Sequence, residues 1–446
     1  MFERKIIKDL IKWKNRAQRK PLILRGARQV GKTTVVNMFS KEFDYFVELN
    51  LDLFADQQIF KSDYGIDDII QAIQVLKNIS FNKGSVLIFI DEIQNSAQAI
   101  KMLRYFYENR PDIFIIAAGS LLEIALENKN ISFPVGRVEY LYMYPFNFEE
   151  FLQASKENKL IEIIASEKIP DYAHDKLMKL FHRYTLVGGM PEIIKTYLAD
   201  NDLGSLKGVF QSLLVSFISD AEKYARNNTL KSIITHCLNA VPAETGKRIK
   251  FQNFGNSSYR SREVGEALRL IEKAMIIYLI YPVTNTDIPS ITDFKKSPKL
   301  QFLDTGIINY FTGIQPEFFK YDDLNAIYKG LIAEHIVRQE IIANDYADNS
   351  PVPIWTRESK ASNAEVDIIV QVKGTIIPVE VKSGAVGSLK SLHLFMDRSE
   401  SDFAVRICGN MMHFEMVSTP SGKIFTLINL PYYLAGNLKE IVGRFI

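Results

Sequence analysis

Between residues 21 and 146, short apolar runs alternate with amphipathic segments. This alternation is typical of a parallel β-sheet whose strands are joined by covering helices. The expected strands are Leu22 to Arg25, Tyr45 to Leu51, Val86 to Ile90, Ile113 to Ala117 and Val138 to Tyr142. The front of the chain is therefore predicted to be an α/β unit.

The pattern changes twice after that point. Residues 148 to 286 are predicted to be mainly helical, with a turn at Gly188-Gly189-Met190-Pro191, because glycine and proline there cannot continue a helix. From about residue 327 the pattern predicts a helix, three strands, a second helix and further strands. We therefore expect three domains, at residues 1–150, 151–290 and 291–446.

Composition narrows the class of protein. Of the 446 residues, 47% are hydrophobic and 24% are charged, which excludes a disordered chain or a collagen-like fibre. The 54 basic and 52 acidic residues leave a net charge of +2, so the overall charge demands no polyanionic partner. Two cysteines, Cys237 and Cys408, exclude a disulfide framework, and no Cys/His cluster has zinc spacing.

The chain is expected to be cytoplasmic and to make no membrane contact. Its basic N-terminus lacks the continuous apolar core of a signal peptide. No later run reaches the length of about 18 uncharged apolar residues that a membrane helix needs. The low cysteine content suits a reducing compartment.

A GxxxxGKT sequence, from Gly26 to Thr33, follows the first expected strand and opens an amphipathic helix that extends to Glu42. This is the context that a phosphate-binding loop requires. Backbone amides turn onto phosphate oxygens, Lys32 supplies charge to the β and γ phosphates, and Thr33 offers a hydroxyl to Mg²⁺. The residues expected to hold ATP are Gly26, Ala27, Arg28, Gln29, Val30, Gly31, Lys32, Thr33 and Thr34.

Two acids, Asp91 and Glu92, follow the buried run Val86 to Ile90. In a parallel sheet they lie at the edge that faces the nucleotide. We expect Asp91 to hold Mg²⁺ through water and Glu92 to orient and deprotonate the attacking water. The alternative is a pair of acids that merely ends a strand. The glutamate directly after the aspartate favours hydrolysis of ATP over phosphorylation of a small molecule.

Two further candidates follow. Ser120, just after the strand Ile113 to Ala117, either places a hydroxyl beside the γ-phosphate as a sensor or belongs to a simple Gly-Ser turn. Arg137 precedes the next strand. Its guanidinium either reaches a γ-phosphate, in cis or across a subunit boundary, or is an ordinary surface group.

Several strings together resemble one known family. They are LRGARQVGKTT, VLIFIDEIQ, AAGS, GRVEYLYMYPFNFEEF, LVGGMPEII, KSPKLQFLDTGIINYFTG and YKGLIAEHIVRQEI. These strings are similar to bacterial and archaeal AAA-family ATPases that carry a conserved C-terminal domain of unknown function. The resemblance covers nearly the whole chain and implies a P-loop ATPase core, a helical or winged-helix linker and a nuclease-like tail. AAA proteins often form rings, so the resemblance also raises the prospect of a homo-oligomer.

The middle section has the outline of a helix-turn-helix with a wing. Helices are expected at Thr229 to Val241 and Ser261 to Ala274, followed by a strand from Met275 to Tyr281. The segment between the helices mixes basic and aromatic residues, namely Lys247, Arg248, Lys250, Phe251, Phe254, Tyr259, Arg260 and Arg262. One interpretation is a DNA contact through the second helix. The other is packing between domains, with the aromatic side chains in the core.

Near the C-terminus, two expected strands at 364–370 and 375–382 form a hairpin. Glu380 and Lys382 share one face of the second strand, and Asp367 lies on its neighbour. Charged side chains in strands made of Val and Ile are costly unless they pair or bind metal. These three residues therefore need an explanation.

The spacing of Asp367, Glu380 and Lys382 resembles the PD-(D/E)xK nuclease motif, although Val366 stands where the motif has proline. The resemblance implies that Asp367 and Glu380 hold Mg²⁺ while Lys382 stabilises developing charge or positions the nucleophile. It also implies a further acid, Glu334, on the preceding helix. The alternative is a solvated cross-strand salt bridge, because ExK pairs are common on half-exposed strands.

Two functions remain in competition. In the first, the front domain hydrolyses Mg-ATP and controls a Mg²⁺-dependent phosphodiesterase site, in a restriction-endonuclease-like α/β domain that acts on DNA. In the second, the ATPase is a switch, and the rear domain binds nucleic acid or a protein partner without cleaving it.

Overall fold

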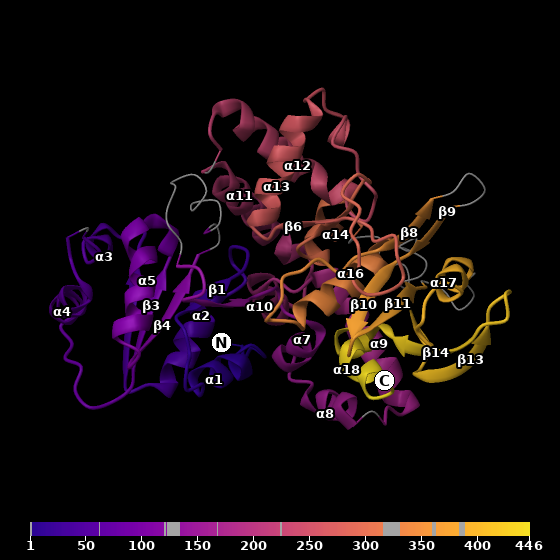
Figure 1. Cartoon of the computed structure of the whole chain (residues 1–446), viewed down its shortest axis with the longest axis horizontal. Helices are drawn as coiled ribbons and strands as arrows, with labels where there is room; N and C mark the ends of the chain where they lie inside the picture. Colours follow the sequence, from indigo (N-terminus) through magenta and orange to yellow (C-terminus); the bar gives the residue numbers. More distant parts are fainter. Residues whose placement is uncertain are drawn as a thin grey trace.

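The computed structural model describes residues 2–61, 63–119, 122, 134–166, 168–223, 225–314, 331–358, 363–382 and 389–446. Figure 1 shows one sheet toward each end of the molecule and a helical section between and above the two sheets. Across these described ranges, no helix combines the length and the apolar character that a membrane span requires.

Five parallel strands form the first sheet, in the order β2-β3-β4-β1-β5. They are β1 (Leu22–Arg25), β2 (Tyr45–Asn50), β3 (Val86–Asp91), β4 (Ile113–Ala118) and β5 (Glu139–Tyr142). All five expected strands are confirmed to within one residue at each end. β4 lies between β1 and β3, so the carboxyl ends of these three strands meet at one edge of the sheet.

Helices cover both faces of this sheet because alternate strand residues point to opposite sides. Leu22 and Leu24 belong to the core under α1 (Ile7–Lys14) and α2 (Lys32–Phe39), whereas Ile23 belongs to the core under α4 (Ile66–Leu76) and α5 (Ala97–Asn109). The short elements of this part are α3 (Phe54–Gln57), η1 (Ser40–Glu42) and η2 (Ile93–Asn95).

The middle section is mainly helical, as expected. Its helices are α7 (Phe148–Ala154), α8 (Asn158–Ser166), α9 (Asp171–Val187), α10 (Pro191–Asp200), η3 (Gly204–Leu206), α11 (Lys207–Glu222), α12 (Asn228–Glu244), η4 (Phe254–Asn256), α13 (Ser261–Lys273) and α14 (Thr305–Phe311). β6 (Ile277–Ile280) pairs antiparallel with β7 (Lys299–Phe302). α12, α13 and β6 confirm the two helices and the strand predicted there.

The second sheet is mixed, in the order β10-β11-β12-β14-β13. Its strands are β10 (Ile368–Val372), β11 (Thr375–Val381), β12 (Phe403–Cys408), β13 (His413–Ser418) and β14 (Ile424–Pro431). β11 and β14 each run parallel to β12, and the outer pairs are antiparallel. The helices of this region are α16 (Leu331–Ala343), α17 (Lys390–Met396), η6 (Tyr432–Asn437) and α18 (Leu438–Gly443).

One expected strand is divided in two. The sequence predicts a continuous strand at 364–370, but β9 (Asn363–Val366) pairs with β8 (Trp355–Glu358) in a separate sheet, and β10 begins after Asp367. The break lies at Asp367 because its side chain accepts a hydrogen bond from the Val381 N–H and its carbonyl accepts one from Arg338. Asp367 therefore lies between β9 and β10, whereas the sequence predicts it within a strand.

A continuous apolar core joins the first sheet, the middle helices and the second sheet. The same buried cluster contains Ile6 and Leu24 at the front, Leu238 in α12, Ile336 in α16 and Val442 in α18. The aromatic residues of the predicted basic segment contribute to it, since Phe254 is buried and Phe251 packs against it. This confirms the interpretation of these rings as core rather than as stacking surfaces.

Candidate functional site

The loop between β1 and α2 lies tightly against the chain that follows β5. A Cβ atom at Gly26 would lie 2.4 Å from the carbonyl oxygen of Met143, so this position accepts only glycine. Gly31, with φ of 98°, caps α2 in the left-handed conformation. The first N–H groups of a helix have no partner within the helix, so the start of α2 offers them to an anion.

Lys32 extends back across this loop. Its Nζ donates hydrogen bonds to the carbonyl oxygens of Gly26 and Ala27, both at 2.9 Å. Burial lowers the pKa of Lys32, and the nearby charges of Glu92 and Asp91 oppose that shift. The ammonium group is thus held where the predicted phosphates lie, and among the described residues it donates to carbonyl groups that an anion can replace.

Thr33 and Asp91 bring the two predicted motifs together. The Thr33 hydroxyl donates to Asp91 Oδ2 at 2.7 Å, and Asp91 is the last residue of β3. A hydroxyl and a carboxylate are the hard oxygen donors that Mg²⁺ prefers, often with several waters retained. The donor set therefore fits Mg²⁺.

Glu92, directly after the end of β3, has an unusual backbone conformation. Its φ is 53° and its ψ is 43°, a left-handed geometry that costs a non-glycine residue on the order of 1 kcal/mol or more. Its N–H donates to Asp91 Oδ1 at 3.0 Å, and its carboxylate accepts a hydrogen bond from Gln94. Burial raises the pKa of Glu92, while Gln94 and Lys32 oppose the shift.

The end of helix α11 packs onto the same loop, a contact that the sequence did not indicate. Arg28 forms an ion pair with Asp220, and Gln29 Nε2 donates to the Ser216 hydroxyl at 3.2 Å. Asp220 also pairs with Lys223 at 3.2 Å. Two of the predicted phosphate-loop residues are therefore held by the middle section.

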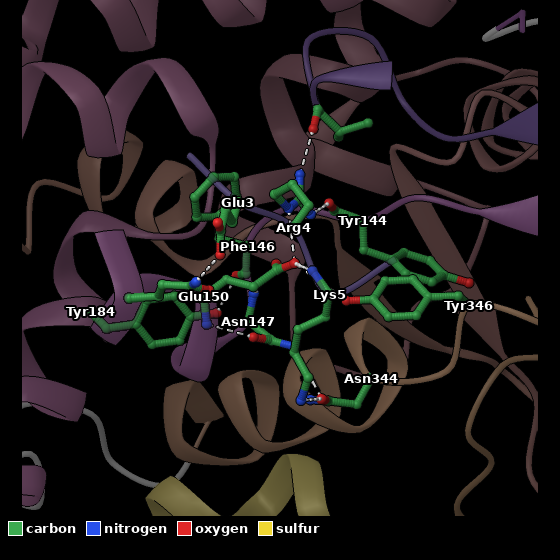
Figure 2. Close-up of polar contacts among 12 residues, drawn as sticks. Glu3, Arg4, Lys5, Tyr144, Phe146, Asn147, Glu150, Tyr184, Asn344 and Tyr346 are labelled. Atoms are coloured by element: carbon green, nitrogen blue, oxygen red, sulfur yellow. Dashed lines mark hydrogen bonds and ion pairs between the residues drawn. The ribbon is translucent and has the colours of Figure 1, made fainter. Parts of the chain in front are cut away.

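A pocket of about 470 Å³ opens beside the start of α2. Its lining includes Phe2, Arg4, Thr34, Phe146, Pro191 and Lys195. The Arg4 guanidinium lies 4.3 Å from the centre of the Phe146 ring and donates to Val30 O at 2.9 Å. Figure 2 shows Arg4 between Tyr144, Phe146 and Glu150. Arg4 Nε forms an ion pair with Glu150 Oε1 at 2.9 Å.

The two weaker candidates of the front domain have different outcomes. Ser120 lies outside the described residues. Arg137 Nε forms an ion pair with Glu108 of α5 at 2.9 Å, and its side chain is half-exposed. Its role as an arginine finger stays a prediction.

Asp367, Glu380 and Lys382 come together at the second sheet. Asp367 Oδ2 accepts the Val381 N–H at 2.8 Å, and Lys382 Nζ pairs with Glu380 Oε1 at 2.6 Å. Glu380 Oε2 is buried and has no hydrogen-bond partner among the described residues. Burial raises the pKa of Asp367 well above its usual range, and the charges of Glu334 and Glu380 add to this rise. Burial also raises the pKa of Glu380.

Glu334 lies near this pair but is compensated by cations. Its carboxylate accepts from Lys299 Nζ at 2.8 Å and from Arg338 at 2.9 Å. Burial alone would raise the pKa of Glu334, but these two cations together lower it. Within the described ranges, no three His, Cys, Asp or Glu side chains form a group suited to a metal ion. The ligand roles of Glu334, Asp367 and Glu380 stay predictions, and Glu334 already has two cations as partners.

Sequence reasoning missed the cations of this cluster. Lys299 of β7 is 5% exposed and also pairs with Glu365 at 2.6 Å. Arg338 follows Glu334 by four residues on α16, which is a helical pairing distance and was the available signal. The role of Arg4 could not be predicted from a local sequence pattern. Its partners Val30, Tyr144 and Glu150 are distant from it in sequence.

The predicted basic segment of the middle section is partly engaged within the chain. Arg248 pairs with Glu358 of β8 at 2.7 Å. A DNA contact through α13 stays a prediction.

Comparison with known proteins identifies the parts of the chain. Residues 18–152 match the family model of an AAA domain. Residues 178–317 and 329–433 match two domains of unknown function, DUF8612 and DUF4143. No curated protein matches the chain.

Two solved structures resemble parts of the chain at low identity. The Walker-type ATPase PABY2304 of Pyrococcus abyssi is 15% identical, with a TM-score of 0.45, over 70% of this chain and 96% of that chain. The Aeropyrum pernix Orc1 protein in complex with DNA is 12% identical, with a TM-score of 0.28, over 69% of this chain and 90% of that chain.

Proposed function

We propose that the AAA domain at residues 18–152 binds and hydrolyses ATP in the presence of Mg²⁺. The observation that carries this proposal is the 2.7 Å contact between the Thr33 hydroxyl and the Asp91 carboxylate. It places the end of β3, where Glu92 follows, directly against the start of the helix that carries Lys32. Phosphate binding, metal binding and water activation are thus available at one point.

The phosphate groups are held by the loop itself. The N–H groups at the start of α2 bind phosphate oxygens, and Lys32 exchanges the Gly26 and Ala27 carbonyls for them. Thr33 and Asp91 would hold Mg²⁺, which neutralises the charge that develops on the phosphates. Burial strengthens each of these electrostatic contacts, because the local dielectric constant is low.

Glu92 acts as the general base. Its left-handed backbone conformation follows the end of β3, and Gln94 fixes the carboxylate by a hydrogen bond. Its raised pKa favours acceptance of a proton from water, because a base is most effective when its pKa approaches the working pH.

The neighbouring pocket takes the base of the nucleotide. It has the volume of about 470 Å³ that such a ligand needs, and it continues from Gly31 and Thr34 of the phosphate loop. The ring of Phe2 offers apolar surface for a flat heterocycle and packs edge-on against the buried Phe146 ring, and Lys195 offers a donor at the rim of the pocket.

The test of this function is phosphate release from ATP by the full chain. We expect release with Mg²⁺ present and its loss after the metal is removed with EDTA, since the phosphates then lose the cation that neutralises their developing charge. Restoration by excess Mg²⁺ serves as the control for damage by the chelator. Absence of both ATP binding and phosphate release with Mg²⁺ present would contradict the proposal.

A second activity is favoured by the buried oxygen atom Glu380 Oε2, which lacks a partner among the described residues. We propose that Asp367 and Glu380 hold Mg²⁺ and that Lys382 stabilises the charge of a phosphodiester in DNA. Mg²⁺ needs only one or two carboxylates from the protein, so the two acids suffice without Glu334. The alternative is a switch in which this surface binds nucleic acid or a protein partner without cleaving it.

A DNA-cleavage assay distinguishes cleavage from the switch. Linear and supercoiled DNA are incubated with the protein and Mg²⁺ or Mn²⁺, with and without ATP. We expect cutting by the unchanged protein and a loss of about 100-fold or more in Lys382→Ala and Asp367→Asn. Lys373→Ala, in the exposed turn of the same hairpin, is the matched control. Cutting that persists in Lys382→Ala indicates a contaminating nuclease, and no cutting under any condition favours the switch.

A further inference from the structure

The turn from Gly188 to Pro191 joins the pocket to the C-terminal half of the chain. Pro191 lines the pocket, and the Gly189 N–H donates to Asp304 Oδ2 at 2.6 Å. A Cβ at Gly189 would lie 2.3 Å from the carbonyl oxygen of Phe146, another residue of the pocket wall. The turn is therefore in direct contact with the pocket wall on one side and with Asp304 on the other.

Tyr184 and Glu340 fix the same wall from helices α9 and α16. The Tyr184 hydroxyl lies 2.7 Å from Phe146 O and 2.7 Å from Glu340 Oε1. Glu340 also accepts the Phe148 N–H at 3.1 Å. These groups are buried, so the loss of any of these hydrogen bonds leaves a polar atom with neither a protein partner nor water to bond to.

The charge of Glu340 explains how one hydroxyl serves two acceptors. Tyr184 has one proton to donate, so both of its contacts are hydrogen bonds only when Glu340 itself carries a proton. Burial raises the pKa of Glu340 to about 7, with Glu150 adding to the rise and Tyr184, the Phe148 N–H and Lys5 opposing it. Glutamine is therefore a close substitute for Glu340 at this position.

Arg338, two residues before Glu340 on α16, contacts the acidic cluster. Arg338 donates to the carbonyl of Asp367, at the point where β9 and β10 separate. The residues of α16 from Ile332 to Ala343 are buried along the whole helix. Arg338 and Glu340 are two positions apart on this helix, so a displacement of one is transmitted to the other through packed atoms.

We propose that α16 couples the nucleotide pocket to the Asp367 cluster, with Tyr184 and Glu340 as positioning residues for the pocket wall. The proposal rests on ATP binding at the AAA domain. A nucleotide that presses on Phe146 moves Tyr184 and Glu340, and Arg338 then shifts the backbone at Asp367. This places Asp367, on which the second site depends, under the control of the first site. The coupling does not depend on whether the second site cleaves or only binds.

Amide hydrogen exchange tests the coupling with the full chain and a slowly hydrolysed ATP analogue plus Mg²⁺. In the unchanged protein we expect the analogue to slow exchange in residues 26–36 and to change exchange in residues 363–372 by about fivefold or more. In Tyr184→Phe the change at 26–36 persists and the change at 363–372 is lost. Glu340→Gln retains both, because the amide can donate to the Tyr184 oxygen.

Tyr433→Phe is the matched control for the loss of a buried hydroxyl. The Tyr433 hydroxyl lies 2.8 Å from Nδ1 of His174, a residue of the same helix α9 as Tyr184. We expect this variant to behave like the unchanged protein. Protection at 26–36 without any change at 363–372 in the unchanged protein overturns the coupling. An equal response in Tyr184→Phe also overturns it, whereas absence of protection at 26–36 refutes nucleotide binding instead.

Discussion

Replacement of Lys32 with alanine is expected to lower ATP affinity and kcat/KM by about a thousandfold. The ammonium group is held in the centre of the loop at 2.9 Å from two carbonyl oxygens, where phosphate oxygens replace them. Two unit charges about 4 Å apart interact by about 4 kcal/mol at an effective dielectric constant near 20. Calorimetric titration with an ATP analogue measures the loss of binding, and phosphate release measures the loss of turnover.

The loss is expected without damage to the fold. Among the residues that the structure describes, Lys32 donates to the carbonyls of its own loop, so its removal should change the free energy of unfolding by no more than about 1 kcal/mol. Lys41→Ala, an exposed lysine just after α2, is the matched control and should keep its activity. Normal ATP binding by a folded Lys32→Ala protein contradicts the assignment of this loop.

Replacement of Glu92 with glutamine is expected to preserve ATP binding while kcat falls by about 10²- to 10⁴-fold. The amide keeps the shape of the side chain and its contact with Gln94, but it does not accept a proton from water. Binding is preserved because Lys32, Thr33 and Asp91 remain. Single-turnover kinetics with saturating ATP, combined with an equilibrium titration, separates the two effects.

The pH profile provides a second measure of Glu92. Because its pKa is raised, the carboxyl group gains a proton at a higher pH than an ordinary glutamate does. A general base acts only when it is deprotonated, so kcat should fall as the pH drops through the raised pKa and should level off above it. Glu42→Gln, at a half-exposed acid of η1, should keep this acid limb. A Glu92→Gln protein that hydrolyses ATP at the normal rate refutes the role.

The front domain could be predicted because its signals are local. A buried run that ends in Asp91-Glu92 and a loop that opens a helix at Lys32 are each contained within a few residues. The remaining requirement is that the residues after β1 and those at the end of β3 lie close together. The parallel order β3-β4-β1 fulfils it by bringing the ends of these strands to one edge of the sheet. The contact between Thr33 and Asp91 is the result.

The acidic cluster was predicted less completely because long-range contacts determine it. The pattern of residues 364–370 favours one strand, yet hydrogen bonds to Asp367 from Arg338 and Val381 break it. Arg338 and Val381 are 29 and 14 residues from Asp367. The hydrophobic pattern of the sequence does not indicate contacts over such separations. Lys299 likewise comes from β7 to compensate Glu334, which sequence alone suggested as a metal ligand.

The unbroken apolar core limits how this chain can be divided. Three separate family matches invite expression of three fragments, but the same buried cluster includes Leu24, Leu238 and Val442. A truncation between the matched segments would expose on each fragment the apolar surface that is now covered by its neighbour. Exposed apolar surfaces of this kind drive aggregation. Truncation boundaries chosen from family matches alone would therefore yield insoluble products, whereas the intact polypeptide keeps these surfaces mutually covered.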